Sequence, residues 1–126
     1  MRHLLSGRKF SRDCGARKAL LRALTTSLFL HGRIETTLAK AKDLRPIAEK
    51  LVTVAKKGRS NLAAVRKLHS FIYQDDAISK AFDIAEKSMS RNGGYIRILK
   101  NNFRKGDAAP VAIIEFVDIS SSSVVS

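Results

Sequence analysis

The stretch RIETTLAKAKDLRP, residues 33–46, passes from a strand pattern to a helix pattern. Its first part, Arg33 to Thr37, is short and rich in β-branched residues, which favours a strand. Thr37 can then cap a helix, because its hydroxyl can accept a hydrogen bond from an N–H group of the first turn. The apolar stripe of that helix continues in phase past Pro46 to Ala55. We therefore expect one helix with a kink at the proline rather than two helices.

The segment before this stretch predicts a first helix from Ser11 to His31. Leucines recur there at helical spacing, as at Leu24 and Leu28. Ser11 is the expected N-cap, and Gly32 supplies the left-handed residue that commonly follows a last helical turn.

The segment after it predicts two more helices and two strands. We expect Asn61 and Asp75 to cap these helices. The side chains expected to face the core are Leu62, Val65, Leu68 and Ile72 in the third helix, and Ile78, Ala81, Phe82, Ala85 and Met89 in the fourth.

The glycine pair Gly93-Gly94 breaks the pattern before the two strands. The first strand is expected at Tyr95–Lys100. The second, Val111–Asp118, is nearly continuously apolar and is expected to be the most buried strand. Because only a loop joins them, we expect the two strands to be antiparallel neighbours.

This order predicts a two-layer α+β fold, with about four helices packed on a small three-stranded sheet in the order α-β-α-α-α-β-β. The expected domain organisation is a basic N-terminal arm over residues 1–10, a single α+β domain over 11–118 and a disordered, Ser-rich tail over 119–126.

The charge balance is the main indication of function. The 126 residues include 24 Lys and Arg against 11 Asp and Glu, a net charge of +13. Such an excess repels itself unless a polyanion neutralises it, and nucleic acid, an anionic membrane or an acidic protein are the candidates. A membrane is the weakest candidate, because the apolar runs are far shorter than the ~20 residues of a spanning helix. The single cysteine and the absence of a signal-peptide pattern predict a cytosolic protein that starts at Met1.

Two groups of residues are candidates for RNA contacts. Arginine pairs with phosphate and stacks on bases, and an aromatic ring can stack on an unpaired base. For Tyr95 and Phe103, base stacking and simple packing remain equally open. The first group lies in the arm and first helix and comprises Arg2, His3, Arg8, Lys9, Arg12, Arg17, Lys18 and Arg22. The second comprises Arg91, Tyr95, Arg97, Lys100, Arg104 and Lys105.

The sequence gives little support for an enzyme. His3, His31 and His69 are far apart, without metal-ligand spacing to cysteine or carboxylates. Asp75 and Asp76 fit helix capping better than catalysis, and no phosphate-binding loop of the Walker type is present. We expect no catalytic residues, metal, cofactor or small-molecule substrate. A flexible basic arm suits irregular RNA. A DNA-packaging or DNA-bending protein is the alternative, and a small RNA-processing enzyme would be a third class.

Five blocks of the sequence resemble bacterial large-ribosomal-subunit protein seventeen: MRH, SGRKFSR, RIETTLAKAKDLRP, GGYIRILK and AAPVAIIEFVD. The resemblance covers nearly the whole chain, to about Asp118, in the family's order. It implies a two-layer α+β structural protein of the large subunit that binds the large ribosomal RNA near the polypeptide tunnel exit. Neighbouring proteins, including the twenty-second and thirty-second large-subunit proteins, are the further partners that it implies.

Overall fold

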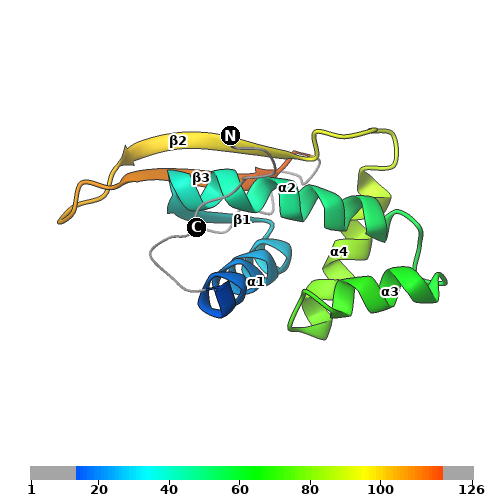
Figure 1. The fold of residues 1–126 in the computed structure, drawn as a ribbon. Coiled ribbons are helices and arrows are strands. Elements are labelled where there is room, and N and C mark those ends of the chain that lie inside the picture. The colour runs from blue at the N-terminus through cyan, green and yellow to red at the C-terminus, as the bar shows by residue number, and fades with distance from the viewer. Residues whose placement is uncertain (1–13, 118–126) are drawn as a thin grey trace, which may run out of the picture.

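A computed structural model of the protein describes residues 14–117, which form an α+β fold of helices and a three-stranded sheet (Figure 1). The order of elements is the predicted one, and the predicted fold class is confirmed. The elements are α1 (Cys14–His31), β1 (Arg33–Thr37), α2 (Leu38–Ala55), α3 (Leu62–His69), α4 (Asp75–Lys87), β2 (Ile96–Phe103) and β3 (Pro110–Phe116). The predicted start of the first helix at Ser11 lies outside the described residues.

The sheet has the strand order β1-β3-β2 and is antiparallel throughout. Ile114 of β3 is aligned with Ile34 of β1 and Ile98 of β2. The predicted pairing of the last two strands is confirmed, and β3 occupies the central position. Strand β3 is the most buried of the three, as predicted, and its buried and half-buried residues alternate. Within residues 14–117 the helices pack on one face of the sheet, so alternate side chains of β3 point into the core.

Strand β2 starts one residue later than predicted and continues three residues further, to Phe103. The predicted loop from Asn101 therefore begins as strand. The pairing with β3 shifts register between Lys100 and Phe103. The sequence of this extension is polar, which is why its periodicity gave no strand signal. Together β2 and β3 form a long hairpin whose tip projects beyond the rest of the sheet (Figure 1).

The helix boundaries follow local chemistry that the sequence indicates well. The Thr37 hydroxyl accepts from the Lys40 N–H at 3.5 Å, and Asn61 Oδ1 accepts from the Ala64 N–H at 3.1 Å, as predicted. Gly32, at a φ of 79°, ends α1 by donating to the Leu28 carbonyl at 2.8 Å. Helix α2 runs through Pro46 as one helix.

Three predictions about α3 and α4 are wrong. Asp75 lies in the first turn of α4, and the N-cap is Gln74. A carboxylate is favourable there too, because the helix dipole places positive potential at its N-terminus. Leu62 and Met89 are each 60% exposed rather than buried. Leu62 is the first residue of the short helix α3, and Met89 follows the end of α4, so neither is held against the core.

The core lies between the sheet and the helices. Helix α2 packs against all three strands, and α1 and α4 pack against each other and against α2. Phe29 of α1 and Phe116 of β3 are each 1% exposed, with ring centroids 5.0 Å apart. This arrangement leaves the outer surfaces of the four helices, together with the projecting hairpin, to carry the charged residues.

Candidate nucleic-acid interface

Five candidates lie outside the described residues, four in the N-terminal arm and one at the predicted start of the first helix: Arg2, His3, Arg8, Lys9 and Arg12. Their contribution to RNA binding stays a prediction. The remaining candidates fall on two parts of the molecule, α1 and the segment from Arg91 to the hairpin tip. Figure 1 places the middle of α1 well apart from the hairpin tip, so the candidates on α1 and those at the tip do not form one site.

The candidates on α1 differ in what their side chains do. Lys18 is exposed, and Arg17 and Arg22 are half-buried. The Nε of Arg22 donates to the backbone carbonyl of Phe71 at 3.0 Å, and its guanidinium carbon lies 4.3 Å from the centroid of the Tyr73 ring. Arg22 therefore joins α1 to the turn between α3 and α4 in addition to any role it has on the surface.

The hairpin carries four basic candidates, of which two are paired with carboxylates. Arg97 Nε lies 3.3 Å from Glu115 Oε1, and Arg104 Nε lies 3.0 Å from Asp107 Oδ1. Hydrogen bonding by the Arg104 side chain lowers the pKa of Asp107 from 3.8 to about 2. Lys100 and Lys105 are exposed side chains. The two lysines therefore carry the positive charge that the hairpin offers to a partner.

The two aromatic candidates separate clearly. Tyr95 is 3% exposed, its hydroxyl donates to the Arg91 carbonyl at 3.4 Å, and Lys56 Nζ lies 4.5 Å from its ring centroid. Phe103 is 71% exposed near the hairpin tip. Burial leaves no face of the Tyr95 ring accessible for a base, so for Tyr95 the structure favours packing, whereas Phe103 stays accessible for stacking.

The loop before β2 is held against α2 from one side and open on the other. The Arg91 carbonyl also accepts from Lys56 Nζ, and the Tyr95 N–H donates to Glu49 Oε1 at 3.0 Å. Between these anchors the glycines are exposed, and a β-carbon added at Gly93 would meet no heavy atom within 4 Å. A phosphate could therefore approach the backbone of this loop closely.

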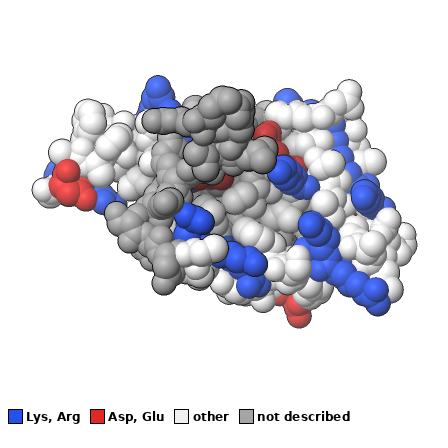
Figure 2. All heavy atoms as spheres, in the orientation of Figure 1, with Lys and Arg blue, Asp and Glu red and all other residues white. Residues whose placement is uncertain are grey.

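Other exposed cations are spread over the helical side of the molecule. In Figure 2, Lys and Arg side chains lie across the lower and right-hand parts of this face, where the helices are, and Asp and Glu occupy a few separate spots. Sequence reasoning did not single out the basic side chains of α3 and α4, because helical periodicity assigns them only to a solvated face. They are Arg66, Lys67, Lys80 and Lys87.

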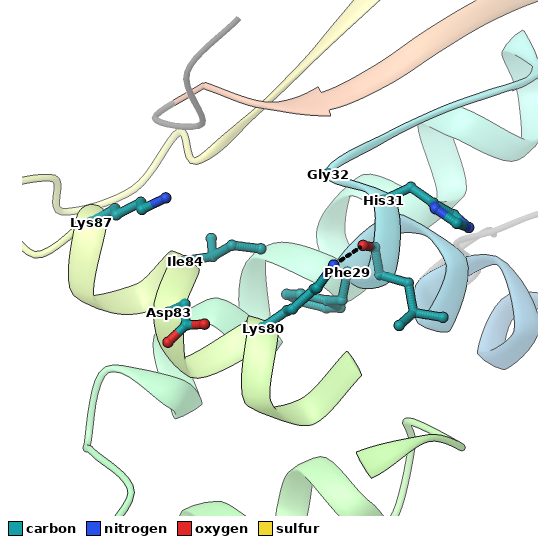
Figure 3. Close-up of a pocket in the computed structure, with 8 residues that line it drawn as sticks. Phe29, His31, Gly32, Lys80, Asp83, Ile84 and Lys87 are labelled. Atoms are coloured by element: carbon teal, nitrogen blue, oxygen red, sulfur yellow. Dashed lines mark hydrogen bonds between the residues drawn. The ribbon is translucent and has the colours of Figure 1, made fainter. Parts of the chain in front are cut away.

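An open pocket of about 260 Å³ lies between the C-terminal end of α1 and α4 (Figure 3). Lys80 Nζ reaches across it and donates to the Leu30 carbonyl at 2.8 Å. The one carboxylate that lines it, Asp83, is paired with Arg59 at 2.6 Å. The Lys80 hydrogen bond thus joins α4 to the end of α1 across the pocket.

Two further findings bear on the class of protein. Within residues 14–117, no three His, Cys, Asp or Glu side chains are grouped so that they could hold a metal ion. In the same residues, no helix is both long enough and apolar enough to cross a membrane.

Comparison with known proteins finds ribosomal proteins, which agrees with the basic character of the described surface. The family model of ribosomal protein L17 matches residues 20–117. The large ribosomal subunit protein bL17 of Paramagnetospirillum magneticum is 51% identical over 119 residues, which are 94% of this chain and 84% of that protein. The bL17 of Ehrlichia canis is 50% identical over 127 residues, 98% of this chain and 96% of that protein. The bL17 of Desulforamulus reducens is 54% identical over 111 residues, 87% of this chain and 97% of that protein.

The α+β fold, the excess of exposed cations and these matches together define a ribosomal protein, structural rather than enzymatic. Within that class, the chain belongs to the ribosomal protein L17 family. The resemblance noted from the five sequence blocks is thereby confirmed.

Proposed function

We propose that this protein is built into the large ribosomal subunit in the cytoplasm, where it neutralises and orders segments of the large ribosomal RNA. The observation that carries the proposal is the number of exposed cations on two separate surfaces, the helical side and the projecting hairpin. The net charge of +13 needs a polyanion, and two separated basic surfaces can contact two RNA segments that would otherwise repel each other. Most such contacts go to backbone and shape rather than sequence.

The proposed position, near the polypeptide tunnel exit and beside the twenty-second and thirty-second large-subunit proteins, rests on the family resemblance. Chemical crosslinking of assembled large subunits, read out by mass spectrometry, tests it. Crosslinks from the exposed lysines Lys100 and Lys105 to one of these neighbours would support the position. Crosslinks confined to proteins remote from the exit would contradict it.

The direct test of RNA binding uses two double variants with the same loss of charge. Lys100→Ala with Lys105→Ala removes the hairpin lysines, and Lys42→Ala with Lys50→Ala removes two exposed lysines of α2, a face that carries acidic residues as well. Affinity for protein-free large-subunit ribosomal RNA is measured over a series of salt concentrations. Each lost phosphate contact reduces the slope of log K against log salt by roughly 0.7–0.9.

Because the hairpin variant lacks two lysines, we expect the magnitude of its slope of log K against log salt to fall by about 1.4–1.8. The slope of the α2 variant should fall by less. Equal effects of the two double variants on the salt slope would show that the hairpin has no special role in RNA binding.

Co-sedimentation of the natural protein with the large subunit through a high-salt sucrose gradient provides the cellular test. Release into the light fractions, or recovery with DNA, would favour a DNA-binding protein instead.

A further inference from the structure

Tyr73 is an exposed aromatic side chain in the turn between α3 and α4, with 52% of its surface accessible. Its ring is nevertheless held in place. The Arg22 guanidinium covers it at 4.3 Å from the centroid, and the Tyr73 N–H donates to Thr26 Oγ1 at 3.2 Å. Exposed tyrosines seldom need explanation by themselves, but here neighbouring residues fix the position of the ring while leaving about half of the residue open to solvent.

The groups that hold the ring are themselves fixed. Thr26 is 4% exposed, and its hydroxyl donates to the Arg22 carbonyl at 2.9 Å. Arg22 Nε donates to the Phe71 carbonyl at 3.0 Å. The guanidinium and the ring are therefore both oriented by contacts to backbone atoms before any partner arrives, which reduces the entropy lost on binding.

Arg22 keeps most of its hydrogen-bonding capacity. A guanidinium has five N–H donors, and the Phe71 carbonyl takes the one on Nε. The terminal N–H groups point to no acceptor within residues 14–117. Lys18 lies four residues earlier on the same helix, hence on the same face, and is exposed. Positive charge and unused donors thus lie beside an accessible ring.

We propose that Tyr73 and Arg22 form a binding site for one unpaired nucleotide of the large ribosomal RNA, which deepens the proposed function and rests on it. The nucleobase stacks on the open part of the Tyr73 ring, and the terminal N–H groups of Arg22 bind its phosphate. Asp75 and Asp76 follow the tyrosine closely and would repel a phosphate on their side, so the phosphate lies on the side of Arg22 and Lys18. Stacking on an aromatic ring tolerates any base, since every base has a π face.

The simplest competing explanation is that the pair only fastens α1 to the turn. A second is that the exposed ring docks on another ribosomal protein. The natural chain contains no tryptophan, so Tyr73→Trp introduces a single fluorescent reporter at the proposed site. Leu62→Trp places the same reporter at a 60% exposed position on α3 and is the matched control. Both variants are titrated with protein-free large-subunit ribosomal RNA.

We expect the RNA to quench the indole fluorescence of the Tyr73→Trp variant saturably, and to change that of the control little, because stacking on a base quenches indole emission. In affinity measurements, Tyr73→Ser should weaken binding by roughly 5- to 100-fold without changing the salt slope, and Tyr73→Phe should bind like the natural protein. Thermal unfolding of each variant is measured alongside, since a purely structural pair would lower stability and leave the affinity unchanged.

The outcomes separate this inference from the function on which it rests. If the natural protein does not bind the RNA, the proposed function itself fails. If it binds but the Tyr73→Trp variant is not quenched and Tyr73→Ser binds normally, the nucleotide site is overturned. If Tyr73→Ser binds RNA normally but is excluded from assembled large subunits, the ring docks on a protein, and the inference is likewise overturned.

Discussion

Replacing Pro46 with alanine should stabilise the protein. Pro46 lies in the middle of α2, an 18-residue helix, and its side chain is exposed, so no core contact is lost. Proline lacks the N–H that the carbonyl four residues earlier would accept, and it is about 3 kcal/mol less favourable than alanine in a helix interior. Proline also restricts the unfolded chain, which offsets about 0.4–1 kcal/mol of that difference. The expected net gain is therefore about 2 kcal/mol.

Thermal and urea unfolding measure this gain. A chain of this size shifts its melting temperature by about 4 °C per kcal/mol, so the variant should melt about 8 °C higher. Lys50→Ala, an exposed change in the same helix, is the control and should stay within about 0.5 kcal/mol of the natural protein. A lower melting temperature for Pro46→Ala would refute the reasoning. It would mean that α2 needs the geometry imposed by the proline to pack against the sheet.

Three further predictions concern the core, a helix cap and the hairpin tip. Phe116→Ala should lower the free energy of unfolding by about 3–5 kcal/mol, since Phe116 is 1% exposed; a loss below about 1 kcal/mol in urea unfolding would contradict its place in the core. Asn61→Ala should cost about 1 kcal/mol and Asn61→Asp much less, because only the aspartate retains an oxygen that can accept from the Ala64 N–H; equal losses would argue against the cap. Because Arg104 lowers the pKa of Asp107 to about 2, their pairing stabilises the hairpin tip above pH 3.8 and is lost as the pH falls toward 2. A carboxyl NMR titration should therefore show the Asp107 midpoint rising toward 3.8 in Arg104→Gln, and an unchanged midpoint would rule out this cause.

The parts of the fold that the sequence predicted well depend on local chemistry. The caps at Thr37 and Asn61 and the stop at Gly32 each need only a short run of residues, and all three are confirmed. The errors at Leu62 and Met89 arose where a periodic pattern continued past the part of the helix that touches the core. Whether a helix end faces solvent depends on tertiary packing, which a single sequence does not contain.

In the candidate site, too, the sequence predicts what depends on nearby residues and misses what depends on tertiary packing. Several of the basic candidates are exposed, but the sequence analysis missed the carboxylate partners of Arg97 and Arg104. The partner of Arg97 is Glu115, which faces it from the neighbouring strand, whereas Asp107 is close enough in sequence to Arg104 to have been noticed. Tyr73 carried no signal at all, because its pairing with Arg22 joins residues that are far apart in the chain.

The central position of β3 has a consequence for how the protein is made. Within residues 14–117, strands β1 and β2 are not hydrogen-bonded to each other, and each pairs with β3, which is synthesised after them. While the ribosome is still making the chain, β1 therefore has no partner, and a fragment that stops before Pro110 has no sheet for its helices to cover. Pairing across such a long separation is slow compared with helix formation. During this interval the nascent chain exposes apolar helix faces and strand edges, so chaperone binding should be strongest just before β3 emerges.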